Sequence, residues 1–177
     1  MAWYDSIQKL WIDYFVWVRE YLYELIRHRT NLSYFENRII RNISDFSLFL
    51  TSFYGEDSAK QFEDLLMQHF RLISEFGATI HSEQDYRPLS DIYYANANDI
   101  ARFLAGLNPN WDEGTWQELL RRQFYLEQYL IYLLHTEAYA EYISQYDDMY
   151  ASIQQIISYM TDGIAAQFNL SHPTLPG

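Results

Sequence analysis

Apolar residues recur at intervals of three and four positions along almost the whole chain, and strict alternation of apolar and polar residues is absent. This spacing matches the 3.6-residue turn of an α-helix, so the pattern predicts an all-α protein. Glycine, proline and asparagine divide the pattern into about six amphipathic segments. We expect helices over residues 3–29, 33–55, 58–81, 88–107, 111–134 and 136–168.

The connections between these segments are short, which makes consecutive helices antiparallel neighbours. We therefore predict an up-and-down helical bundle formed by a single domain over residues 1–168, followed by a flexible C-terminal tail over 169–177. Ser33 and Glu36 have the spacing of a capping box, and Gly55 suits the left-handed end of the second helix. Thr136 is the expected N-cap of the last helix. The apolar stripe expected to face inward on that helix is Tyr139, Ile143, Tyr146, Tyr150, Ile153, Ile157, Met160 and Ile164.

A shift of 54 residues aligns the second and third predicted helices with the fourth and fifth, without a gap. Helical periodicity requires apolar matches between two such segments, but it does not require polar ones. The matched polar positions are Asn42 with Asn96, Asp45 with Asp99, and His69 with Gln123. We interpret the match as an internal duplication of a helix–turn–helix unit, which predicts pseudo-twofold symmetry.

The composition excludes several classes of function. The chain has 177 residues and no Cys, so disulfides, iron–sulfur clusters and thiolate zinc sites are impossible. Its formal net charge of −12 disfavours binding to nucleic acid and to anionic lipid. No window of about 18 uncharged apolar residues exists, so no membrane insertion is predicted. Because the N-terminus does not resemble an export signal, we expect a cytoplasmic protein.

Several polar residues lie on the predicted inward stripes. Tyr14, Asn42, Asn96 and Gln123 are of this kind, and burial without a partner costs about 1–3 kcal/mol. We therefore expect these side chains to meet in a buried hydrogen-bond network that fixes the register of the helices.

A second interpretation is a small-molecule or divalent-metal site at the pseudo-twofold axis. His69, Asp45 and Asp99 are the candidate ligands, because imidazole and carboxylate groups suit zinc, manganese or iron. No known catalytic motif is present: the chain lacks a glycine-rich phosphate loop, a His-Glu-x-x-His sequence and the paired Glu-x-x-His sequences of di-iron bundles. We assign no catalytic residue.

Four segments carry a family resemblance: Phe53-Tyr54-Gly55-Glu56, Asp64-Leu65-Leu66-x-x-His69, Asn108-Pro109-x-Trp111 and Asp162-Gly163-Ile164-x-x-Gln167-Phe168. With Asn42 and Asp45, they resemble a family of short, uncharacterised bacterial all-helical proteins, many from spore-forming Gram-positive species. The resemblance covers about residues 10–168. Some members carry the label acetylglutamate kinase, an activity that this chain cannot support because it has no phosphate loop and is too short for that fold.

The resemblance also implies a site. In relatives, three His and one Asp would converge inside the bundle, at the positions of Tyr14, His69, Gln123 and Ser158 in this chain. Only His69 is retained, which implies that a neutral hydrogen-bonded core replaces a metal site here.

The high content of aromatic residues, with 17 Tyr, 11 Phe and 5 Trp, favours an interface as well as a core. We therefore predict a non-enzymatic protein that acts through self-association, as a homodimer, or through a protein partner. The alternative is a bundle that binds a small molecule or a divalent metal.

Overall fold

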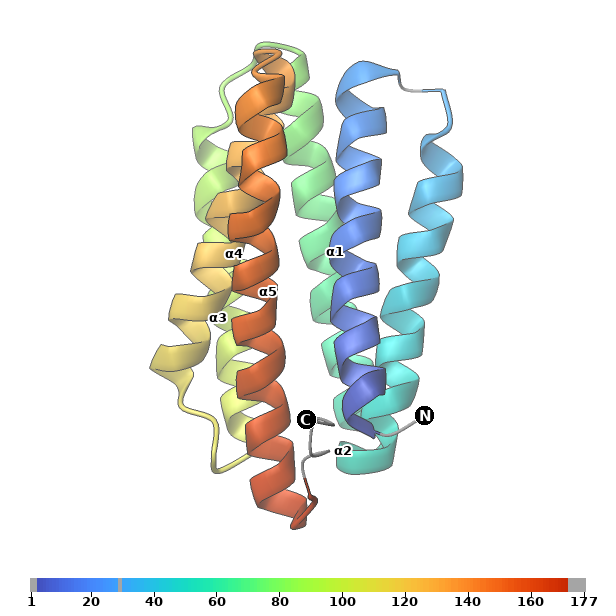
Figure 1. Cartoon of the computed structure of the whole chain (residues 1–177), viewed down its shortest axis with the longest axis vertical. Helices are drawn as coiled ribbons and strands as arrows, with labels where there is room; N and C mark the ends of the chain where they lie inside the picture. Colours follow the sequence, from blue (N-terminus) through green and yellow to red (C-terminus); the bar gives the residue numbers. More distant parts are fainter. Residues whose placement is uncertain (1–2, 29, 172–177) are drawn as a thin grey trace.

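The computed structural model describes residues 3–28 and 30–171, and in this part of the chain it contains α-helices and no strand. The predicted all-α bundle is confirmed, with neighbouring helices packed side by side along one long axis (Figure 1). The helices are α1 (Trp3–Arg27), α2 (Leu32–His81), α3 (Arg87–Leu107), α4 (Glu113–His135) and α5 (Tyr139–Phe168). Most of the expected tail, residues 172–177, lies outside the described residues.

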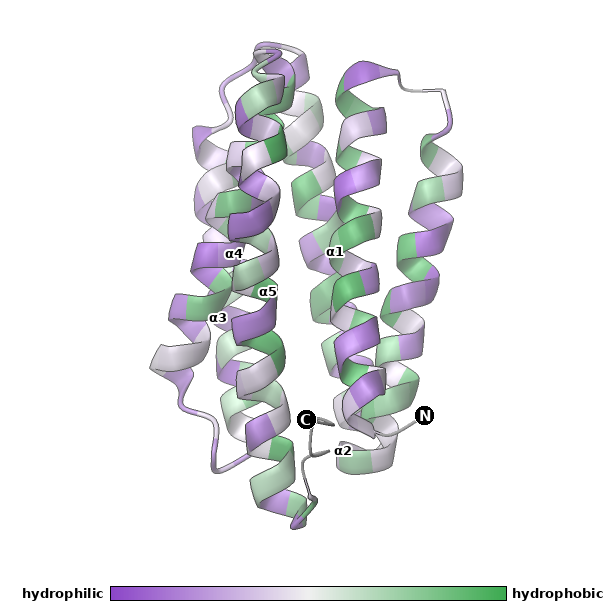
Figure 2. Cartoon of the chain, viewed as in Figure 1, coloured by the Kyte–Doolittle hydropathy of each residue, from purple (hydrophilic) through white to green (hydrophobic). Residues whose placement is uncertain are grey.

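Each helix has an apolar face and a polar face, and hydrophobic and hydrophilic residues alternate around every ribbon (Figure 2). The apolar faces meet in one core that is rich in aromatic side chains. Its largest fully buried members include Trp116, Tyr21, Tyr93, Phe15, Phe46 and Phe62. Among the described residues, no helix combines the length and apolar character needed to cross a membrane.

The helix count is five rather than about six, because α2 includes both the second and the third predicted helices. Gly55 lies at the predicted boundary between them, with φ 79° and ψ 169°, a conformation essentially restricted to glycine. The chain reverses direction there, and the halves 32–54 and 56–81 run antiparallel (Figure 1). The rings of Phe46 and Phe62 pack 5.5 Å apart across the two halves. The helix thus forms a hairpin in itself.

Two predicted helix starts are wrong. The N-cap of α2 is Asn31, which makes no side-chain cap, and the buried carboxylate of Glu24 binds this end of the helix instead. Glu24 accepts hydrogen bonds from the backbone N–H groups of Thr30 and Asn31 at 2.9 and 2.8 Å. Thr136 ends α4 instead of beginning α5, and Ala138 precedes α5.

The ends of α2 and α4 have the same backbone turn. Ser82 and Thr136 follow the last helical residues, with φ/ψ of −87°/7° and −85°/2°. The next residues, Glu83 and Glu137, have left-handed φ values of 56° and 59°. Each pair is separated by 54 positions, the offset that aligns the two halves of the sequence.

The beginning of α1 and the end of α5 meet at one residue. The ring of Phe53 lies 6.5 Å from that of Trp3 and 5.2 Å from that of Phe168. Phe53 precedes the reversal in α2, so the first and last helices of the chain are joined at the same end of the bundle.

The predicted inward stripe of α5 is only half right. Ile153, Ile157, Met160 and Ile164 are buried, but Tyr139, Ile143, Tyr146 and Tyr150 are exposed. In the first half of α5 the buried side chains are Tyr142 and Met149. That half therefore has apolar residues both toward the core and toward solvent, and periodicity alone did not show which of them are buried.

Candidate functional site

A cluster of polar side chains lies in the middle of the core, and Glu127 of α4 is at its centre. Its carboxylate is 3 % exposed. Tyr93 of α3 donates a hydrogen bond to Oε2, and Nε2 of Gln123 donates one to Oε1 at 3.2 Å. His69 Nε2 of α2 lies 3.1 Å from Oε2. Three groups from three helices thus surround one carboxylate.

Aromatic rings hold His69 in place. Its imidazole stacks on Phe124 with the ring centroids 4.0 Å apart, and on Tyr93 at 5.1 Å. The ring of Tyr14, from α1, lies 6.1 Å away. Helices α1 to α4 therefore each contribute a side chain, and the packing of the bundle sets the geometry of the cluster.

The two tyrosines of the cluster resist ionisation. Burial raises the pKa of Tyr14 well above 10.0, and the nearby Glu127 raises it further. The pKa of Tyr93 is also raised well above 10.0, first by burial and then by Glu127. Both phenols are therefore neutral over the physiological range, and Tyr93 keeps the proton that it donates to the carboxylate.

The cavity within the cluster has a volume of about 10 Å³. Its lining includes Tyr14, His69, Gln123 and Glu127. This volume is at the lower limit for a single water molecule. A substrate therefore has no room beside these groups, and the arrangement suits a structural hydrogen-bond network better than catalysis.

The predicted buried network is assembled in part. Tyr14 and Gln123 line the cavity together, as expected. Asn42 and Asn96 are also buried, but each donates its amide to a backbone carbonyl outside the cluster, at 3.3 Å in both cases. Ser158 is exposed on α5, because the inward face of that helix passes through its neighbour Ile157 and turns away from position 158.

The predicted metal ligands do not come together. His69 is buried, whereas Asp45 and Asp99 are exposed on the surface, and Asp99 pairs with Arg102 at 2.9 Å. An i to i+3 step advances by about 300° around a helix, which moves each Asp to the edge of the inward face. In the part of the chain that the structure describes, no group of three or more His, Asp or Glu side chains could hold a metal ion. The structure therefore does not bring His69, Asp45 and Asp99 together as one ligand set.

Glu127 was missed by the sequence analysis, although a signal for it existed. Its position continues the inward stripe of α4, four residues after Gln123 and three before Leu130. Glutamate is almost never fully buried without partners, so Glu127 was not predicted to be buried although its position faces inward. Here Tyr93, Gln123 and His69 supply those partners.

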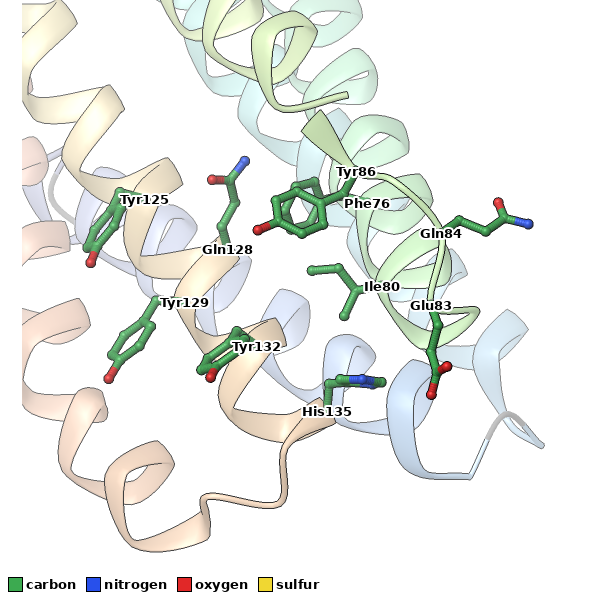
Figure 3. A pocket seen from close by; sticks show the side chains of 10 residues that line it. All are labelled: Phe76, Ile80, Glu83, Gln84, Tyr86, Tyr125, Gln128, Tyr129, Tyr132 and His135. Carbon is green, nitrogen blue, oxygen red and sulfur yellow. The ribbon is translucent and has the colours of Figure 1, made fainter. Parts of the chain in front are cut away.

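A second candidate site is an open groove of about 420 Å³ between the end of α2 and the face of α4. Figure 3 shows Tyr125, Tyr129 and Tyr132 one after another along α4, with Ile80 of α2 and Tyr86 across from them. We call this the tyrosine groove. Its lining is Phe76, Ile80, Glu83, Gln84, Tyr86, Tyr125, Gln128, Tyr129, Tyr132 and His135.

Comparison of the chain with family models, with curated proteins and with solved structures finds no match in any of the three. The resemblance to uncharacterised bacterial helical proteins therefore stays a prediction, and the function must be argued from the surface and the core described above.

Proposed function

We propose that the protein is a non-enzymatic helical bundle that acts by pairing with a second copy of itself through the exposed face of α5. The closed core supports the first part of the proposal, since its cavity of about 10 Å³ leaves no space for a substrate beside His69 or Glu127. The observation that carries the second part is an apolar stripe on the surface of α5.

This α5 stripe consists of Tyr139, Ile143, Tyr146 and Tyr150. Its spacing of four, three and four residues is the spacing of a helix–helix seam. Ile143 is 68 % exposed, and the three tyrosines are 38–39 % exposed. Tyr142 and Met149 bury the adjoining face of α5 in the bundle, and the ring of Tyr146 contacts the buried ring of Phe15 at 5.8 Å, so the outer part of the stripe is left to a partner.

Charges along the two borders of the α5 stripe favour a second copy as the partner. On the border toward α1, the Arg19 guanidinium lies 4.7 Å from the ring centre of Tyr142 and 5.5 Å from that of Tyr146. On the other border, the exposed Asp147 lies one residue beyond Tyr146, at the same height along the helix. A twofold axis parallel to α5 places opposite borders together, so that Arg19 of each copy meets Asp147 of the other.

The duplication inferred from the sequence is also part of this proposal. Its support is the shared turn at the ends of α2 and α4, where Glu83 and Glu137 are both left-handed. A left-handed conformation is costly for glutamate and rare for residues other than glycine. We propose that residues 33–81 and 87–135 are two copies of one helical hairpin, flanked by α1 and by α5 with its stripe.

Light scattering after size exclusion, at increasing protein concentration, tests the pairing. We expect a dimer that Ile143→Glu abolishes, because a charge would be buried in the middle of the seam. Leu48→Glu is the matched control, since Leu48 is 72 % exposed on α2 and lies outside the stripe. Exchanging the charges with Arg19→Glu should weaken the dimer, and adding Asp147→Arg should restore it.

A strict monomer at every concentration would overturn the proposal. Equal loss of the dimer in Leu48→Glu would show that α5 is not the seam.

A further inference from the structure

The tyrosine groove has the size of a ligand site. Its volume of about 420 Å³ lies within the range of about 300–1,000 Å³ that small-molecule sites occupy. Most of its lining is apolar or aromatic, while Glu83, Gln128 and His135 provide polar groups. In Figure 3, Glu83 and His135 lie at the same end of the groove, and Gln84 points away from the other side chains.

The three tyrosines of α4 form a ladder of parallel rings. Tyr125 and Tyr129 have ring centroids 6.2 Å apart and planes inclined by 9°, and Tyr129 and Tyr132 are 6.4 Å apart with an angle of 12°. Tyr125 and Tyr132 are more than half exposed. The faces of such rings carry partial negative charge and attract cations.

Among the Asp, Glu, Lys and Arg side chains, only the carboxylate of Glu83 contributes to the groove lining. Arg87 follows the lining residue Tyr86 in the chain, and its guanidinium donates hydrogen bonds to both carboxylate oxygens of Asp85, at 2.9 Å each. The whole chain has a formal net charge of −12. An anionic ligand would therefore be repelled, and a cationic one attracted.

The chain's own cations do not occupy these rings. Arginines lie over Tyr139, Tyr142, Tyr146 and Trp17, but among the described residues no arginine or lysine is placed over a ring of the groove. The ladder thus presents the same electron-rich ring faces that bind arginine elsewhere in this protein, and these faces are accessible to a ligand from solution.

We propose that the tyrosine groove binds a small organic cation, an ammonium group attached to an apolar or aromatic body. The ammonium group lies against the ladder at Tyr132, the ring nearest the end of the groove where Glu83 and His135 lie, and the body packs on Phe76 and Ile80 (Figure 3). This site is independent of the α5 stripe and of the pairing proposed for it.

Calorimetric titration with three probes tests the proposal: benzyltrimethylammonium, benzyl alcohol and benzoate, which share a ring and differ in charge. We expect benzyltrimethylammonium to bind most tightly and benzoate least. Because a cation–π contact at an exposed site is modest, each Tyr→Leu change in the ladder should weaken binding of the cation by about two- to fivefold.

Matched variants separate ring chemistry from simple bulk. Tyr129→Leu combined with Tyr132→Leu should weaken binding of the cation by about five- to twentyfold, whereas Phe at both positions should preserve it. Glu83→Gln should weaken it by about two- to fivefold, and more so at low salt. Tyr34→Leu, at an exposed position outside the groove, should leave binding unchanged.

Three results would overturn the proposal. One is the absence of binding heat for benzyltrimethylammonium in the millimolar range. Another is binding of benzoate or benzyl alcohol as tight as that of the cation. The third is unchanged binding of the cation in the double Leu variant, with circular dichroism confirming that the variant is folded. None of these results bears on the oligomeric state.

Discussion

Replacement of Glu127 by Leu is the most direct test of the buried cluster. The substitution removes the only acceptor that Tyr93, Gln123 and His69 share within the cluster. Leucine has a similar volume, so the change in packing is small and the loss of polar partners dominates the effect.

The magnitude follows from the number of groups left without a partner. A buried donor without an acceptor costs about 1–3 kcal/mol, and three side chains lose their shared acceptor here, while the removed carboxylate no longer has to be desolvated. Glu127→Leu should therefore lower the free energy of unfolding by about 3–5 kcal/mol. A domain of this size has about 5–15 kcal/mol available, so the variant should remain largely folded.

A double-mutant cycle with His69→Leu isolates the pair. Once His69 is replaced, the loss of Glu127 leaves one buried group fewer without a partner. The double variant should therefore lose about 1–3 kcal/mol less free energy of unfolding than the sum of the losses in the two single variants. Urea unfolding followed by far-ultraviolet circular dichroism measures all four proteins. Strictly additive effects, or a cost below about 1 kcal/mol for Glu127→Leu, would refute the assigned network.

Further predictions concern other parts of the molecule. Burial raises the pKa of Tyr54 and of Tyr142 from 10.0 to about 12. Because the folded state favours the neutral phenols, the free energy of unfolding should be constant below about pH 10 and fall as the pH rises toward 12. Urea unfolding at successive pH values measures this change. Ionisation of every tyrosine at an ordinary pKa in the native protein would contradict the prediction. Gly163→Ala should destabilise the fold by about 1–3 kcal/mol, since the new Cβ would lie 1.9 Å from Trp111 Nε1. Gly106→Ala, where a Cβ meets nothing within 4 Å, should instead stabilise α3 by about 0.5–1 kcal/mol in the same assay, and similar effects of the two changes would refute the packing argument.

The period of apolar residues was sufficient to predict the helices, and Gly55 to predict the reversal within α2. Periodicity was not sufficient in the first half of α5, where two apolar faces compete and only the packed neighbours decide that Tyr142 is buried and Ile143 is exposed. It also failed for Asp45, because one helical step of three residues separates a buried position from an exposed one.

The uncharged residues of the candidate site could be predicted from the sequence, but its central residue, Glu127, could not. The burial of Tyr14 and Gln123 was predicted from their places on apolar stripes. The burial of Glu127 could be predicted only with knowledge of the three partners that compensate for its desolvation. Gln123 lies one turn away on the same helix, but Tyr93 and His69 lie on other helices, 34 and 58 residues away in the sequence, and no local pattern relates these two to Glu127.

The meeting of Trp3 and Phe168 on Phe53 has a consequence for the connectivity of the fold. Both ends of the helical region lie beside one ring, while residues 82–86, between α2 and α3, are all exposed. A short linker could join the present ends, and the chain could begin instead within 82–86. The same five helices would then assemble from a circularly permuted gene, because the packing of this bundle depends on which helices are neighbours and not on which is made first.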